Sequence, residues 1–325
     1  MIEFIAKNRF KTCACLVFLA IGLFQEPRYG QAAQDLAIKQ MAEQGNANDQ
    51  YKLGLKYAAG TGAQDAEQAV FWYRKAAEQG HAAAQFLLGT KYATGTGVAK
   101  DAEQAVFWYR KAAKQGHAAA HLLMGGSYAE GIGVAQDANQ AVFWYRKAAE
   151  QGYADGQRLL GICYSAGIGV AQDAKQAVFW YRKAAEQGNA KAQSLLGLSY
   201  AEGTGVAQDA KQAAFWHRKA AEQGYALGQL ALGLSYYEGK GLVQDNTQAY
   251  VWLSVAAANG AATAAELRDI TAKKLTQSQL KEAQKLAGRY FEIYRKRLAN
   301  SPCVSVSQAA RVAVSHAERL PCITS

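Results

Sequence analysis

The segment DAEQAVFWYRKAAEQG, residues Asp65–Gly80, decides the fold because it recurs with small changes along most of the chain. The copies are spaced 36 residues apart and begin at Asp65, Asp101, Asp137, Asp173, Asp209 and Asp245. Each copy carries one tryptophan, and these are Trp72, Trp108, Trp144, Trp180, Trp216 and Trp252. A repeat of this length is typical of a solenoid, in which each unit hides its apolar face against its neighbours. We therefore expect a stack of similar units with these tryptophans in the repeat core.

The sequence of each repeat unit predicts two helices. The first is typified by residues 82–95 and the second by residues 101–116. The aspartate that opens the second helix is a good N-cap, because its carboxylate accepts free backbone N–H groups of the first turn. Gln104, three residues after Asp101, predicts a capping box. The Gly-x-Gly between the helices supplies residues that tolerate a positive φ. Only the first copy, whose turn reads GTGAQD over residues 60–65, is one residue shorter.

The domain plan follows from the repeat. Six units occupy residues 46–260, a half-repeat at 33–45 closes the N-terminal end, and helices within 261–299 close the other end. Residues 300–325 form a tail. Only three prolines occur, Pro27, Pro302 and Pro321, so the repeats lack the residue that most disfavours helices. The prediction is an all-α solenoid of six 36-residue helix pairs with capping helices.

The pattern A-x-x-x-L-G-x-x-Y-x-x-G-x-G-V-x-x-D-x-x-x-A-x-x-W-Y-x-x-A-A-x-x-G resembles the Sel-one-like repeat, a relative of the tetratricopeptide repeat. Residues 252–287 are also similar to the way many such bacterial proteins end. The resemblance implies a right-handed superhelix whose first helices line the inner face, and an adaptor or scaffold role, often periplasmic or secreted. A cysteine-rich branch of the family is credited with penicillin binding and β-lactamase activity. That branch has a disulfide in each repeat, which this chain lacks, so such a cell-envelope enzyme is only the alternative.

The N-terminal segment is typical of an export signal. Lys7, Arg9 and Lys11 precede an apolar run over residues 13–24, and small residues permit cleavage after Ala32. The run is shorter than the ~20 residues that a membrane span needs. We expect residues 1–32 to direct the chain to the periplasm or outside the cell. An uncleaved anchor and a cytoplasmic amphipathic start are the alternatives.

Export would leave three cysteines, Cys163, Cys303 and Cys322. An oxidising compartment permits a disulfide between the last two. A continuous helix would hold them ~28 Å apart, whereas a disulfide needs Cα atoms within ~7 Å. The pair can bond only if the tail folds back; otherwise the cysteines stay free or pair between chains.

The net charge of +10 is uneven along the chain. Residues 33–265 hold 21 basic and 19 acidic side chains, whereas residues 266–325 hold 11 and 5. We expect the basic end, Lys273 to Arg297, to be a solvated helix end. A regulator that docks this end on an anionic membrane surface is the alternative. With export, nucleic acid is not an expected partner.

The copies differ mainly in their first helices, whereas five of the six second helices present the same Arg–Lys pair, expected to be a solvated face. Repeat scaffolds discriminate between partners only where their units differ. We therefore expect a protein or peptide to bind a concave site that includes Lys56, Lys91, Ser127, Arg158 and Ser199. Drift after duplication is the alternative explanation of these differences.

No catalytic constellation is recognisable. His117 and His121 have the spacing of two zinc ligands, but no third ligand accompanies them. Cys163 has no neighbouring histidine and reads as a structural thiol. We expect no cofactor, no metal and no enzymatic activity, but a monomeric scaffold for protein–protein interaction.

Overall fold

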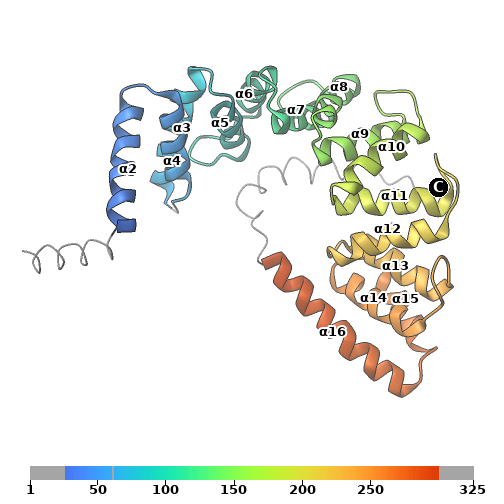
Figure 1. The fold of residues 1–325 in the computed structure, drawn as a ribbon. Coiled ribbons are helices and arrows are strands. Elements are labelled where there is room, and N and C mark those ends of the chain that lie inside the picture. The colour runs from blue at the N-terminus through green and yellow to red at the C-terminus, as the bar shows by residue number, and fades with distance from the viewer. Residues whose placement is uncertain (1–25, 61, 300–325) are drawn as a thin grey trace, which may run out of the picture. The chain divides into compact units, whose positions relative to one another are not determined.

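The computed structural model describes residues 26–60 and 62–299, and every regular element in these ranges is an α-helix (Figure 1). The first helices of the six copies are α3 (Ala47–Ala58), α5 (Ala82–Thr94), α7 (Ala118–Glu130), α9 (Ala154–Ala166), α11 (Ala190–Glu202) and α13 (Ala226–Glu238). The second helices are α4 (Ala63–Glu78), α6 (Ala102–Lys114), α8 (Ala138–Glu150), α10 (Ala174–Glu186), α12 (Ala210–Glu222) and α14 (Asn246–Ala258). At the ends are α2 (Glu26–Glu43), α15 (Ala264–Ala272) and α16 (Gln277–Ala299). Cys303, Cys322, the tail and most of the expected signal lie outside the described residues.

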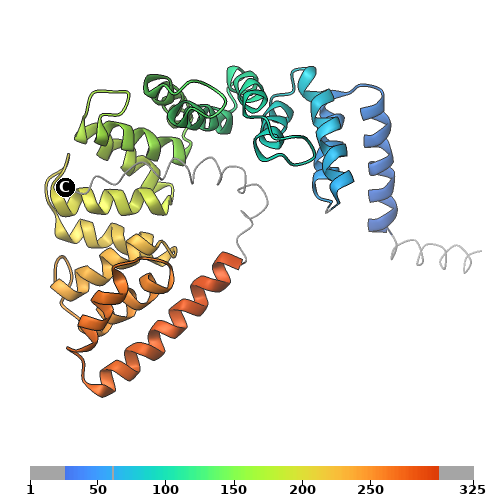
Figure 2. The same ribbon diagram turned by 180° about the vertical axis from the view of Figure 1, so that it is seen from behind.

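The chain divides into two compact units, one ending at Lys100 and the other starting at Asp101. In the first unit, α2, α3, α4 and α5 pack on one another in chain order. In the second, α6 to α15 do the same, and α16 packs against α14 (Figure 2). The predicted all-α solenoid of helix pairs is confirmed.

In all copies but the second, whose helices fall in different compact units, a glycine in the middle of the first helix lets the two helices of a copy approach closely. At Gly161 an added Cβ would lie 2.6 Å from Cδ1 of Tyr181, so the tyrosine ring rests directly on the backbone of α9. Gly54 and Gly125 receive Tyr73 and Tyr145 in the same way. The Leu–Gly pair of the repeat is therefore a packing requirement.

The aspartate caps form as expected from the second copy onward. Asp173, for example, accepts a hydrogen bond from the backbone N–H of Gln176 at 3.0 Å. The predicted reciprocal half of the capping box does not form at Asp137, Asp173, Asp209 or Asp245. There the aspartate's own N–H donates to a tyrosine carbonyl of the first helix, as Asp173 does to Tyr164 at 2.9 Å.

The first copy departs from this arrangement. Its shorter turn lets α4 start at Ala63, so Gly62 is the N-cap and Asp65 lies at the third helical position. The carboxylate of Asp65 accepts from the backbone N–H of Gly62 at 3.3 Å. Asp65 thus does not cap as its counterparts do, because one missing residue moves the helix start.

The tryptophans connect neighbouring copies. Trp72, Trp108 and Trp252 are buried, and the other three are partly buried. Trp180 packs against the apolar cluster formed by α9 of its own copy and by α7 and α8 of the preceding copy. At the C-terminal end, Tyr290 of α16 stacks on Trp252 with ring centroids 5.1 Å apart. The last tryptophan is therefore covered by the capping helix instead of by another repeat.

Candidate functional site

The second helices present a nearly uniform surface, and it makes contacts beyond those expected. The arginine of the Arg–Lys pair donates to a tyrosine hydroxyl of the next copy, as Arg182 does to Tyr200 at 2.9 Å. The lysine lies over the phenylalanine ring one turn earlier, with Lys183 Nζ 4.8 Å from the centroid of Phe179. Arg182 and Lys183 are exposed, as expected of a solvated face, and the Arg182 contact also connects neighbouring copies.

A groove of about 580 Å³ lies between α10 and α12, lined by Phe215, Trp216 and Lys219 among others. The same three residue types recur one copy earlier, at Phe179, Trp180 and Lys183. Because the lining repeats, this groove cannot distinguish one copy from the next. Selectivity must arise elsewhere.

The fifth residue of the first helices differs between copies in size, polarity and charge. The six residues are Tyr51, Phe86, Leu122, Arg158, Ser194 and Leu230. Only Arg158 is charged. Its side chain is 3% exposed, so a cation occupies a place where neighbouring copies hold leucine or serine.

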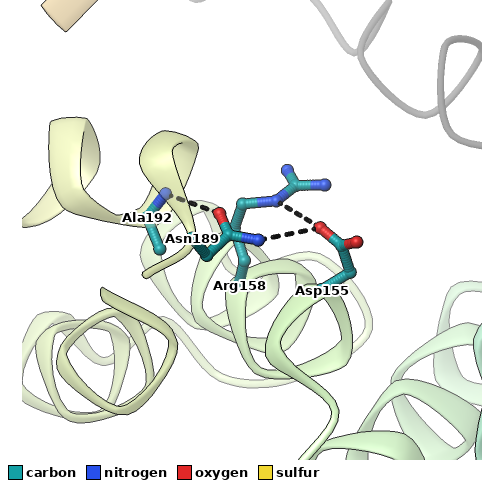
Figure 3. Close-up of polar contacts among 4 residues, drawn as sticks. All are labelled: Asp155, Arg158, Asn189 and Ala192. Carbon is teal, nitrogen blue, oxygen red and sulfur yellow. Dashed lines mark hydrogen bonds and ion pairs between the residues drawn. The ribbon is translucent and has the colours of Figure 1, made fainter. Parts of the chain in front are cut away.

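Arg158 belongs to a small polar network between two copies (Figure 3). Its Nε donates to Oδ1 of Asp155, one turn earlier on α9, at 3.4 Å. The same oxygen accepts from Nδ2 of Asn189 at 3.1 Å. Asn189 is also the N-cap of α11, where its Oδ1 accepts from Ala192 N at 3.0 Å. The network therefore ties the guanidinium to the start of the next first helix.

Besides the carboxylate of Asp155, Arg158 has buried side chains around it that are neutral at pH 7. Burial raises the pKa of Tyr145, and it raises that of Tyr181 to about 12. Arg158 partly offsets both shifts. Burial also raises the pKa of the Cys163 thiol to about 12, which makes it a poor nucleophile. Asp155, with 40% of its side chain exposed, and the partly exposed Asn189 link the network to solvent.

The other predicted site residues lie in different settings. Lys56 on α3 is exposed and Lys91 on α5 is half-buried, and both belong to the first unit. Ser127 on α7 is partly buried in the second unit. Ser199 on α11 is buried, and its hydroxyl donates to Leu195 O of its own helix at 3.0 Å. Arg158 differs from these four because its buried cation belongs to a polar network that reaches the next copy.

Asp155 and Asn189 were missed by the sequence analysis. Asp155 looks like a first-turn acid, and Asn189 looks like an ordinary N-cap, which it also is. Their spacing of 34 residues, close to one repeat, was the signal that could have paired them.

Among the described residues, no group of three or more His, Cys, Asp or Glu side chains could hold a metal ion. His117 and His121 instead serve the fold: His117 caps α7 by accepting from Ala120 N, and His121 Nε2 lies 2.9 Å from Ala113 O. In residues 26–60 and 62–299, no helix has both the length and the apolar character to cross a membrane.

The Sel1 repeat model matches six consecutive segments, residues 47–81, 82–117, 118–153, 154–189, 190–225 and 226–260. The chain belongs to the Sel1 repeat family. This confirms the resemblance seen in the sequence. No curated protein matches the chain.

Two solved structures are similar to this Sel1 repeat chain. A Sel1 repeat protein from Oxalobacter formigenes is 37% identical with a TM-score of 0.61, and the match covers 70% of this chain and 93% of that one. A protective antigen of uropathogenic Escherichia coli strains, c5321, which displays the same repeat fold, is 33% identical with a TM-score of 0.55. That match covers 90% of this chain and 67% of the antigen. Sel1 repeat proteins are generally scaffolds for protein–protein interaction and are typically not enzymes.

Proposed function

We propose that this chain is an exported, non-enzymatic scaffold that binds a protein partner along its first helices. One observation carries the proposal: the second helices repeat the same surface, whereas the first helices differ in charge, size and polarity. A partner that must be told apart from other proteins needs such differences. The contrast is clear at the fifth residue, where Arg158 stands among apolar and small side chains.

A pair of crosslinking positions tests the binding face. Leu198 on first helix α11 and Phe179 on second helix α10 are 47% and 45% exposed, so a photoreactive residue is equally accessible at either place. In the native cell, position 198 is expected to capture one discrete protein, and position 179 is not. Capture from position 179 alone would move the binding face to the second helices.

Export is tested separately. The basic residues Lys7, Arg9 and Lys11 and the apolar run at 13–24 support a signal cleaved after Ala32. Fractionation and N-terminal sequencing of the mature chain should find it outside the cytoplasm, beginning at Ala33. A cytoplasmic chain that retains its first residues would contradict this part of the proposal.

Two alternatives have their own readouts. Hydrolysis of nitrocefin by the purified chain, lost on substitution of a defined residue, would favour an enzyme of the penicillin-binding kind. Salt-sensitive sedimentation with acidic liposomes would favour a membrane-docked regulator that uses the basic end, residues 273–297.

A further inference from the structure

Arg158 is a buried cation with incomplete hydrogen bonding. Its Nη2 atom is buried and has no hydrogen-bond partner. Its bond to Asp155 is 3.4 Å long, whereas charge-assisted N–H···O bonds are about 2.7–2.9 Å. A buried charged donor without an acceptor is destabilising. The arrangement therefore lacks an acceptor on the terminal guanidinium nitrogens.

The fold does not require arginine at this place. Leu122 and Leu230 occupy the same position in two other copies, and Leu122 is buried there. Leucine would fill the space without burying a charge. In the described part of the chain, Arg158 gains only one long bond to Asp155 in return, and a residue that breaks a local rule with so little compensation points to a role in binding.

We propose that Arg158, flanked by Asp155 and Asn189, is the receptor for a carboxylate group on the bound partner. The proposal rests on the function proposed above and names the chemistry of the contact. With Nε committed to Asp155, the two terminal nitrogens remain as a planar fork, which matches the two oxygens of a carboxylate. Because Nη2 is covered, carboxylate binding requires the Arg158 side chain to turn toward the exposed side of Asp155.

The neighbouring charges select a monoanion. The carboxylate of Asp155 shares the guanidinium, so a doubly charged phosphate would meet more repulsion than a carboxylate does. Tyr145, Tyr181 and Cys163 remain neutral and add no further repulsion. The carboxylate belongs either to an acidic side chain or to a chain terminus.

Three small probes test the receptor without the partner. The Nε–H resonance of Arg158, assigned by its loss in Arg158→Lys, is followed in the full chain while N-acetyl-glutamate methylamide is added. N-acetyl-glutamine methylamide is the neutral match, and N-acetyl-alanine with a free carboxylate represents a chain terminus. We expect saturable shifts with one or both carboxylates and none with the glutamine probe. Equal shifts with glutamine, or none with either carboxylate, would overturn the receptor. The carboxylate probe that binds more tightly shows whether the partner's carboxylate belongs to an acidic side chain or to a chain terminus.

Matched variants separate binding from structure. Asp155→Asn should strengthen carboxylate binding several-fold, because it removes the competing charge. Arg158→Leu should weaken it at least about tenfold, measured on the neighbouring backbone amides, and should raise the melting temperature. A lower melting temperature with unchanged binding would make Arg158 structural and refute the proposal. If Arg158→Leu does not fold, Arg158→Lys takes its place in the binding measurement. These titrations do not involve the partner. If they fail, the carboxylate receptor is refuted, and the proposed scaffold function is still tested by crosslinking at position 198.

Discussion

Glycine occupies two kinds of left-handed position in this fold, and they differ in what surrounds them. Gly169, in the turn between α9 and α10, has φ of 66°, and an added Cβ would strike the carbonyl of Ala138 on the preceding second helix. Gly188, after α10, has φ of 90°, and nothing lies within 4 Å of an added Cβ. The first position needs glycine for contact and conformation, the second for conformation alone.

Alanine at these two positions should therefore give unequal losses of stability. Gly188→Ala is expected to cost about 1 kcal/mol, the strain of a left-handed alanine. Gly169→Ala adds a backbone clash between copies and is expected to cost about 3 kcal/mol. Urea denaturation followed by circular dichroism measures both. Equal losses would mean that the inter-copy contact at Gly169 contributes nothing.

His217 introduces a dependence of stability on pH. It stands where other copies have tyrosine, and burial lowers its pKa from 6.5 to about 4. The folded chain therefore binds fewer protons than the unfolded chain between these two values. The contribution of neutral His217 is present above pH 6.5 and is lost as the pH falls towards 4, by on the order of 3 kcal/mol.

The matched variant is His217→Tyr, which restores the residue of four other copies. It should flatten the fall in unfolding free energy between pH 6.5 and 4. Some slope will remain, because burial also lowers the pKa values of His81, His117 and His121. If the variant has the same pH profile as the parent chain, His217 is not the titrating group.

At the scale of helices, a buried glutamine joins three elements in most copies. Gln193 on α11 donates to Ala185 O of α10 at 3.0 Å and accepts from Gln223, after α12, at 2.7 Å. Gln50, Gln157 and Gln229 make the same two kinds of contact. The third copy has His121 instead, with its Nε2 in place of the amide nitrogen.

Substitutions at Gln193 should follow this logic. Gln193→Leu removes one of the donors to Ala185 O and the short bond of the Gln223 amide, which then keep Gly188 N at 3.0 Å and Lys219 O at 3.5 Å, and it is expected to cost about 2 kcal/mol. Gln193→His should cost less at pH 8, because neutral imidazole can donate to Ala185 as His121 does to Ala113. It should lose stability below pH 6, where protonation is favoured in the unfolded chain. Denaturation of both variants at pH 8 and pH 5 checks the pattern; a histidine variant as weak as the leucine one at pH 8 would contradict it.

The same elements show how far sequence reasoning reaches. The repeated sequence pattern predicted the helix pairs, the aspartate caps from Asp101 onward and the end helices, because these depend on local signals. The pairing of Arg182 with Tyr200 did not follow from local signals, since it depends on how the next copy is stacked. Arg158 was chosen from its difference between copies, but Asp155 and Asn189 were not. Their contact joins two copies and arises only when both variable positions carry the right residues.

At the scale of the whole molecule, neighbouring copies are interchangeable wherever their contacts repeat. Removing residues 190–225 would bring α13 onto α10. Gly228, which now meets Ala220, would meet Ala184, and Gly241 would meet Ala174 in place of Ala210. The amide of Gln229 would find Ala185 O in place of Ala221 O. α10 therefore offers α13 nearly the same residue types as α12 does, with Val178 and Tyr181 where α12 has Ala214 and His217.

The shortened chain should therefore fold, with unchanged helicity per residue and an unfolding free energy lower by a few kcal/mol, the loss of one copy and one interface. It should also keep carboxylate binding, because Asp155, Arg158 and Asn189 are retained and Asn189 then precedes Ala226. Removing only residues 190–207 is the control, since it takes away one first helix and places two second helices in succession. That chain has lost the first helix against which Trp216 packs and should lose cooperative unfolding. Should both deletions unfold alike, the copies are not independent units, and stacking against immediate neighbours does not account for the stability of the array.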